Sequence, residues 1–155
     1  MLLENKVAVI YGAGGSIGGA VTRAFAREGA RVFLAGRTQS SLDEVANDIH
    51  SQGDAADTAI VDALDAMEGL RRQWAVELGP HGIRVLTLKT GGIPESIPED
   101  APERDEIINN LLPRTLLNRA ASLEDVGNVA AFAASDQART ITSTEINISC
   151  GAIVD

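Results

Sequence analysis

The sequence predicts an α/β protein with a largely parallel sheet, on three observations. Short apolar, β-branched runs alternate along the chain with longer segments whose apolar residues recur at helical spacing. Small and β-branched residues are abundant while aromatic residues make up only 3% of the chain, which suits parallel strands covered by helices on both faces. The length of 155 residues favours one domain over two. We therefore expect a single doubly wound domain over residues 1–155.

Recognisable signals bound the expected elements. The first strand is expected over residues 6–11, up to Gly12, and the first helix over residues 16–28, with Gly29 as its stop. Between residues 90 and 106, prolines and acidic residues indicate an irregular loop. The remaining strands are expected at residues 32–35, 58–61, 84–88 and 145–148. The remaining helices are expected from a capping box of Ser41 and Glu44 to Gly53, from about Asp65 to Leu78, over residues 107–112, and from a capping box of Ser122 and Asp125.

Composition and charge narrow the classes of partner. Lys and Arg total 13 against 22 for Asp and Glu, a net charge of −9, and no basic run occurs. Because nucleic-acid affinity comes mainly from cations that replace counterions, DNA, RNA and anionic membranes are not expected as partners. No apolar stretch approaches the ~18 residues that a membrane span needs, and residues 1–6 lack a signal-peptide pattern. We expect a cytoplasmic protein.

Cysteine and histidine offer little chemistry. The single Cys, Cys150, excludes an intrachain disulfide and is expected to be a small core residue. His50 and His81 lie far apart, and neither has a Cys or carboxylate at ligand spacing. No metal site is expected.

The turn between the first strand and the first helix is rich in glycine. Gly12 can make the tight exit from the strand, Gly14 and Gly15 let backbone approach a ligand, and Gly18 permits close helix packing. The helix N-terminus offers N–H groups and a partial positive charge to a pyrophosphate. The alternative is a purely structural turn. The candidate cofactor-binding residues here are Gly12, Gly14, Gly15, Ser16, Ile17 and Gly18.

The end of the second strand bears on which dinucleotide binds. NAD sites place a carboxylate there for the ribose 2′-hydroxyl, whereas an Arg accommodates the 2′-phosphate of NADP. Here Gly36 is followed by Arg37 and Thr38, with no acid before Asp43. The sequence therefore favours NADP over NAD, with Arg37 and Thr38 as phosphate contacts.

Taken together, these motifs resemble the short-chain dehydrogenase/reductase family. Residues 1–65 are similar to its cofactor-binding half, and residues 66–155 to its C-terminal part, so the resemblance covers nearly the whole chain in two blocks. It implies a shortened Rossmann-like sheet of about five strands. It also implies that Asp62 contacts adenine and that Ile93 meets the nicotinamide carboxamide.

The family's catalytic residues are missing between the two blocks. Members carry an Asn-Ala-Gly strand motif, a catalytic Ser and a Tyr-x-x-x-Lys pair, and this sequence has none of them. The Tyr and Lys positions would fall at Ile60 and Leu64, neither of which can transfer a proton. Ordinary carbonyl reduction is therefore not expected, because proton transfer of this kind contributes ~10²–10⁴-fold.

Two smaller departures touch the cofactor site. Ser16 replaces the family's third glycine, and a Ser at a helix start can serve as its cap. Glu95 stands where a Thr often reaches the cofactor's phosphate, and a carboxylate there would repel it.

Three functions stay open on the sequence. The chain is an NADP-binding protein without its usual catalytic groups, an active oxidoreductase with another proton donor, or a non-catalytic oligomerisation protein with a vestigial cofactor site. Cofactor binding and turnover discriminate among them.

The missing block also affects the fold and the assembly. If the fourth strand packs beside the first, the sheet order is 3-2-1-4-5; alternatively, two chains exchange elements. Apolar helix faces that lose their neighbours predict a homodimer or homotetramer. The residues of these faces are Met67, Leu70, Trp74, Leu78, Val126, Val129 and Phe132.

Overall fold

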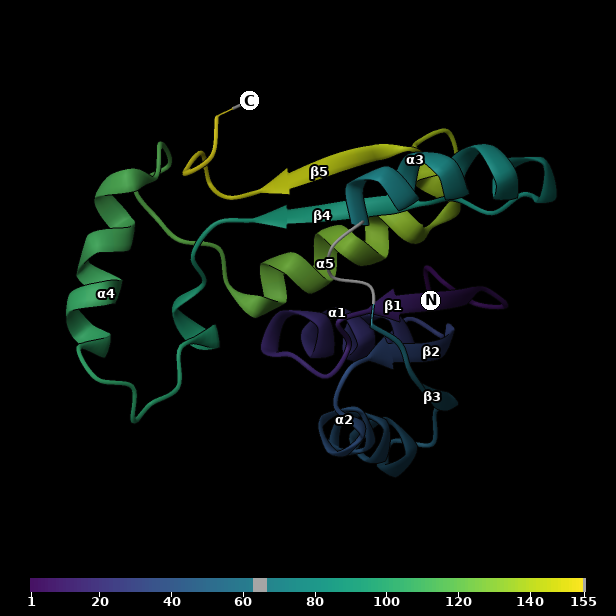
Figure 1. Ribbon diagram of the computed structural model, residues 1–155, viewed down its shortest axis with the longest axis horizontal. Helices are drawn as coiled ribbons and strands as arrows, with labels where there is room; N and C mark the ends of the chain where they lie inside the picture. Colours follow the sequence, from purple (N-terminus) through teal and green to yellow (C-terminus); the bar gives the residue numbers. More distant parts are fainter. Residues whose placement is uncertain (63–66, 155) are drawn as a thin grey trace.

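The computed structural model describes residues 1–62 and 67–154 and is an α/β fold in which all strand pairs are parallel (Figure 1). This confirms the predicted class. The strands are β1 (Val7–Tyr11), β2 (Arg31–Gly36), β3 (Ala56–Ile60), β4 (Leu86–Thr90) and β5 (Thr144–Ile148). The α-helices are α1 (Ser16–Arg27), α2 (Gln39–Ser51), α3 (Met67–Leu78), α4 (Arg104–Leu111) and α5 (Leu123–Ala134). Short 3₁₀ turns are η1 (Gly79–His81), η2 (Pro94–Ser96), η3 (Leu112–Arg114) and η4 (Asp136–Ala138).

The first half of the chain forms a three-stranded sheet in the order β1-β2-β3. The face of its middle strand that carries Val32 and Leu34 is completely buried, because α1 and α2 pack against this strand. The apolar residues of α1 and α2 that recur at helical spacing face this sheet and join one core. The elements predicted for this half are all present.

The second half forms a separate two-stranded sheet, in which β4 pairs with β5. Within the described residues β1 pairs only with β2, so the predicted continuous order 3-2-1-4-5 is wrong. That order was inferred from crossover handedness, which decides the sense of a connection but not whether two strand edges meet. The two halves are joined instead by helices, since α1 and α5 pack against each other.

Hydrogen bonds from Arg84 connect the start of β4 to the end of α5. Arg84 lies shortly before β4, and its guanidinium donates to backbone carbonyls at and beyond the C-terminus of α5. The acceptors are the carbonyl oxygens of Ala133, Ala134, Ser135, Ala138 and Ile141. Because helix ends leave such carbonyls without partners, this single side chain both caps α5 and holds the second sheet to it.

Of the two predicted capping boxes, one forms and the other does not. Ser122 and Asp125 form theirs as predicted. Ser41 and Glu44 do not, because α2 already begins at Gln39, with Thr38 as its N-cap. The connection from β2 is therefore shorter than the sequence pattern indicated.

The predicted apolar helix faces are only partly exposed. Val126 is wholly buried between α5 and the core, so its assignment to an open face was wrong. Leu70, Trp74 and Leu78 are half-buried, and the side chain of Met67 lies outside the described residues, as does Asp65. Among the described residues, no helix is both long and apolar enough to cross a membrane.

Candidate functional site

The glycine loop lies between β1 and α1 and is tied to the end of β2. The N–H groups of Gly12 and Ala13 both donate to the carbonyl oxygen of Ala35, at 2.8 and 3.2 Å. Ala13 is completely buried, whereas Gly12 and Gly15 are exposed. The loop is thus anchored to Ala35 while Gly12 and Gly15 stay exposed. Gly14 is half-buried, and a Cβ there would lie 3.0 Å from Cβ of Ser41.

The turn uses glycine in the two ways that the sequence predicts. Gly12 adopts a φ of +75°, a left-handed conformation that favours glycine. A Cβ at Gly18 would overlap the carbonyl oxygen of Gly12, so α1 can begin directly over the loop only with glycine there. The loop continues with a hydrogen bond from Gly15 N to Gly12 O of 3.1 Å.

The N-terminus of α1 has no side-chain cap. Gly15 is the N-cap and Ser16 the first helical residue, so the expectation that Ser16 caps the helix was wrong. The first turn contains no acidic residue. Ile17 packs its side chain against the core, and the N–H groups in the first turn of a helix have no partner within the helix. An uncapped helix end of this kind attracts an anion.

Beyond β2 the site is cationic. Arg37 and Thr38 are exposed, and the salt bridges among the described residues do not involve Arg37. The nearest acid in the sequence, Asp43, accepts a 2.6 Å hydrogen bond from Gln39 Nε2. The guanidinium of Arg37 is therefore available to a phosphate.

Of the two remaining predicted cofactor contacts, Asp62 is exposed and Ile93 is buried. Asp62 is exposed just beyond β3, where Val61 N still bonds to Gly36 O at 2.8 Å. Ile93 is only 2% exposed and belongs to the core. Its carbonyl oxygen accepts from both N and Oγ of Ser96, at 2.9 and 2.7 Å. Ile93 could therefore meet a ligand only through its backbone N–H.

Glu95 has a role that sequence reasoning missed. Its carboxylate accepts a 2.6 Å hydrogen bond from the N–H of Leu123, the first residue of α5. The negative charge thus lies at a helix N-terminus, where it is stabilised. The partner lies 28 positions along the chain, so no local pattern could indicate it.

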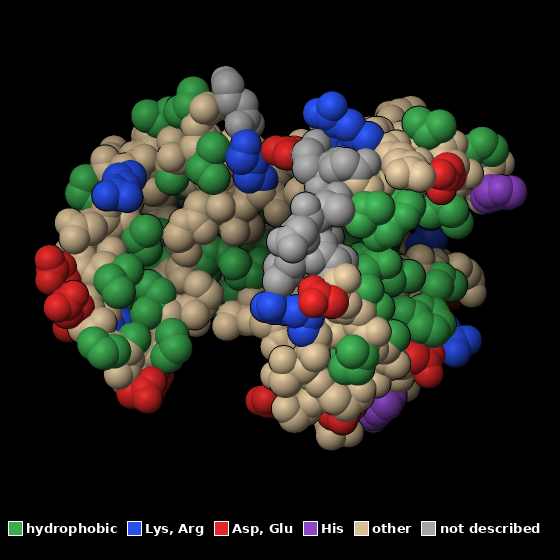
Figure 2. Space-filling model, in the orientation of Figure 1, with side chains coloured by type: hydrophobic (Ala, Val, Ile, Leu, Met, Phe, Trp, Pro, Cys, Tyr) green, Lys and Arg blue, Asp and Glu red, His purple; other side chains and the backbone are tan. Residues whose placement is uncertain are grey.

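The strands direct these residues to one region. The carboxyl ends of β1 and β2 face the same side as those of β4 and β5 (Figure 1). The surface is hollowed on that side, between α4 and the lobe that contains α2 (Figure 2). In open α/β sheets, ligands bind at the carboxyl ends of the strands.

A further pocket lies at the carboxyl end of β4. It has a volume of about 290 Å³ and is lined in part by Thr90, Gly91 and Gly92, which directly precede Ile93, the predicted nicotinamide contact. Leu111 and Arg114 line it from the opposite side. Neither residue was among the site residues predicted from the sequence.

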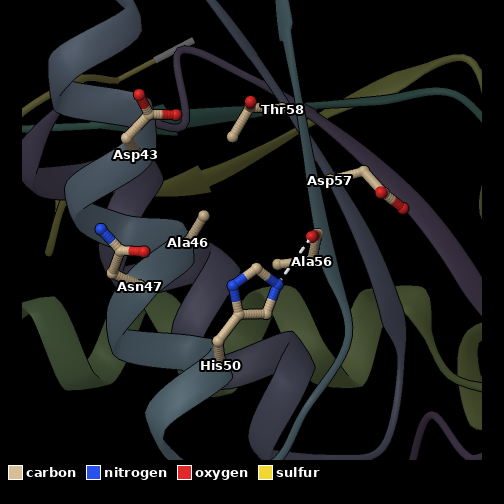
Figure 3. Close-up of a pocket in the computed structure, with 7 residues that line it drawn as sticks. All are labelled: Asp43, Ala46, Asn47, His50, Ala56, Asp57 and Thr58. Carbon is tan, nitrogen blue, oxygen red and sulfur yellow. Dashed lines mark hydrogen bonds between the residues drawn. The ribbon is translucent and has the colours of Figure 1, made fainter.

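A larger hollow between α2 and β3 is not part of this site (Figure 3). None of the predicted cofactor residues lines it. Within it, a partly buried hydrogen bond joins His50 Nε2 to the carbonyl oxygen of Ala56 at 2.9 Å (Figure 3). No group of three His, Cys, Asp or Glu suited to a metal occurs in the described part of the chain.

The positions expected for the family's proton donors hold none. Ile60 is the last residue of β3 and is 56% exposed, and Leu64 lies outside the described residues. Tyr11, the chain's only Tyr, stacks its ring on that of Trp74 with centroids 5.5 Å apart. The ring of Tyr11, at the end of β1, thus packs against α3 through Trp74.

Comparison with known proteins agrees with this geometry. Residues 55–152 match a family model described as enoyl-(acyl carrier protein) reductase, and residues 6–68 match one described as short chain dehydrogenase. The chain belongs to the short-chain dehydrogenase/reductase family. Family members bind a nicotinamide dinucleotide, and those matched here by name are oxidoreductases.

Several curated relatives match parts of the chain. An uncharacterized oxidoreductase of Mycobacterium tuberculosis is 48% identical over 39% of this chain. An NADH-dependent enoyl-acyl-carrier-protein reductase of Bacillus cereus is 32% identical over 57%. A secoisolariciresinol dehydrogenase of Forsythia intermedia is 29% identical over 81%. The chain covers 23%, 35% and 46% of the lengths of these relatives.

Solved structures show the same fold. A short-chain dehydrogenase/reductase of Serratia marcescens superposes with a TM-score of 0.76 at 17% identity, over 98% of this chain and 99% of that one. A short-chain alcohol dehydrogenase of Sinorhizobium meliloti, described as putative, also gives 0.76, at 18% identity. The likeness to these structures shows that this chain has the fold of the family.

Proposed function

We propose that this short-chain dehydrogenase/reductase chain binds NADP(H) in preference to NAD(H) and does not carry out ordinary carbonyl reduction. The observation that carries the proposal is Arg37, an exposed guanidinium without a salt bridge to any described residue, placed directly after β2. A guanidinium can bind a phosphate through two parallel hydrogen bonds, which a ribose hydroxyl cannot accept equally well.

The residues present fit such a dinucleotide. The backbone around Gly12 and Gly15 is open, and the uncapped first turn of α1 suits a pyrophosphate. Thr38 adds a hydroxyl beside Arg37, and Asp62 lies beyond the neighbouring strand for the adenine. The backbone N–H of Ile93 is the group that would meet the carboxamide. When bound, the nicotinamide ring donates or accepts a hydride.

The expected cofactor preference is tested by Arg37→Ala. Isothermal titration of NADPH and NADH should show that the wild type binds NADPH more tightly. The variant should lose about 1.5–3 kcal/mol with NADPH, roughly 10- to 150-fold in Kd, and little with NADH. Arg27→Ala removes an equally exposed guanidinium from the far end of α1 and should change neither affinity.

An NADH-dependent enzyme is among the matched relatives, so a preference of this chain for NADH is the competing outcome that the titration tests. If the wild type prefers NADH, or if Arg37→Ala behaves like Arg27→Ala, then NADP is the wrong cofactor.

The second part of the proposal concerns turnover. The side chain of Ile60, at the position expected for the family's tyrosine, cannot donate a proton. We therefore expect no measurable NADPH oxidation with ketones, aldehydes or enoyl thioesters, followed as loss of nicotinamide absorbance. Turnover that persists through purification and disappears in Arg37→Ala would show instead an active oxidoreductase with another proton donor.

A further inference from the structure

The pocket at the carboxyl end of β4 is built from three segments that are distant in the sequence. Thr90 and the following glycines form one side. Leu111 and Arg114, from α4 and η3, form the second, and Ala152 and Ile153 form the third. Its volume of about 290 Å³ lies near the lower end of ligand pockets, so the occupant is a small molecule or one end of a larger one.

Close packing and hydrogen bonds fix the walls of this pocket. A Cβ at Gly92 would overlap the side chain of Leu111, so α4 lies directly against the backbone after β4. The N–H groups of Leu116 and Leu117 donate to the carbonyl oxygen of Cys150, at 3.0 and 3.2 Å. These bonds tie the segment after η3 to the segment after β5.

The third wall is anchored to β5 by side chains. Asn147 Nδ2 donates to the carbonyl oxygen of Ile153 at 2.9 Å, and Ile153 N donates to Ser149 Oγ at 3.1 Å. Ile153 is thus held in place from both of its backbone polar groups. The pocket is preorganised, which lowers the entropic cost of binding.

The lining combines one cation with apolar groups. Arg114 is exposed, and the salt bridges formed among the described residues leave it out. None of the described residues that line the pocket is acidic, although the chain carries a net charge of −9. Leu111, Ala152 and Ile153 supply the apolar surface. A single guanidinium beside aliphatic side chains suits a monoanion with an aliphatic chain.

We propose that this pocket binds an aliphatic carboxylate, with the carboxylate on the guanidinium of Arg114 and the chain against Leu111 and Ile153. The identification of this carboxylate as a substrate group rests on the proposed function, because the pocket adjoins the segment expected to hold the nicotinamide. The binding itself needs no cofactor.

The test is isothermal titration of the cofactor-free protein with hexanoate and with hexanamide, its neutral counterpart. Wild type should bind hexanoate at least about tenfold more tightly than hexanamide, since a hydrogen bond to a charged group is lost with the amide. Arg114→Gln should weaken hexanoate by about the same factor and leave hexanamide unchanged. Arg139→Gln, which removes an exposed guanidinium elsewhere, should change neither.

Three results would overturn the proposal. The first is that the wild type does not bind hexanoate. The second is that wild type and Arg114→Gln bind hexanoate with equal affinity. The third is that inorganic phosphate binds more tightly than hexanoate and that its binding depends on Arg114. Amide shifts of Gly91 and Gly92 in nitrogen-15 spectra should locate the bound hexanoate in this pocket.

A titration with NADPH separates this proposal from the previous one. Loss of NADPH affinity in Arg114→Gln would show that the pocket holds a cofactor phosphate and would overturn the carboxylate site. If hexanoate binds through Arg114 but NADPH does not bind the wild type, the carboxylate site stands and the proposed cofactor function fails.

Discussion

At the scale of single residues, the start of α5 is stabilised by reciprocal hydrogen bonds. Ser122 Oγ accepts from Asp125 N, and Asp125 Oδ2 accepts from Ser122 N, both at 3.0 Å. The backbone N–H of Ser122 is the main cause that holds the pKa of Asp125 below its usual value. Hydrogen bonds from the Ser122 hydroxyl and from Arg119 lower it further, against an opposing rise from burial. The ionised form is therefore favoured in the folded state.

This predicts a pH dependence for Asp125→Asn. Because the folded pKa lies below the unfolded value of about 3.8, the stabilisation is complete above that value and is lost as the pH falls through the folded pKa. At pH 7 the variant should be less stable by about 0.5–1 kcal/mol, and this difference should vanish in acid. Urea unfolding at both pH values measures it.

The matched control is Glu124→Gln, which removes an exposed charge from the same helical turn without breaking a capping hydrogen bond. A loss of stability as large as that of Asp125→Asn would show that general electrostatics of the helix end, rather than the capping box, is responsible.

At the scale of elements, the contact between α1 and α5 joins the two halves of the molecule. A Cβ placed on Gly127 would lie 2.9 Å from Cβ of Ala24, so the helices approach as closely as small residues allow. Since β1 and β4 share no hydrogen-bonded ladder in the described chain, this helix pair carries the connection. Its close packing therefore matters more here than in an unbroken sheet.

We predict that Gly127→Val lowers the free energy of unfolding by about 1–3 kcal/mol, because the added side chain overpacks this contact. Asn128→Val places the same side chain on the exposed face of the same helix and should have a much smaller effect. Urea unfolding followed by circular dichroism compares the two. Equal effects would mean that the α1–α5 contact adapts readily to a larger residue.

At the scale of the whole molecule, several apolar side chains of β1 and α3 remain exposed. Val7 and Val9 of β1 are 67% and 58% exposed, and Val76 of α3 is 76% exposed. Hydrophobic side chains gather on the face beside β1 and α3 (Figure 2). A contiguous apolar surface is uncommon on a monomer and usually marks an interface, so we expect a homodimer or a homotetramer formed through this face.

The variant that tests this assembly is Val76→Glu. Sedimentation velocity at tens of micromolar should show an oligomer for the wild type and a shift toward monomer for Val76→Glu, since a buried unpaired carboxylate is costly. Gln73→Glu adds the same charge to another exposed position of α3 and should leave the oligomer intact. A monomeric wild type, or equal behaviour of the two variants, would contradict the expectation.

The sequence alone determined the features that neighbouring residues decide. Strand and helix positions follow from apolar periodicity, and the turn at Gly12 and the capping box at Ser122 follow from side-chain and backbone preferences over a few positions. The cationic group at Arg37 also follows directly, because it comes immediately after a strand whose end is recognisable. These features involve short distances along the chain, so their physical causes are present in the local pattern.

Only the tertiary structure decided how distant segments meet. Local pattern cannot show that β1 and β4 share no ladder within the described residues, that Ile93 turns its side chain into the core, or that Glu95 bonds to Leu123. Nor can it show that Arg114 and Ile153 line one pocket. These outcomes depend on where packed helices place the ends of the strands, and that placement is a compromise among contacts over the whole chain.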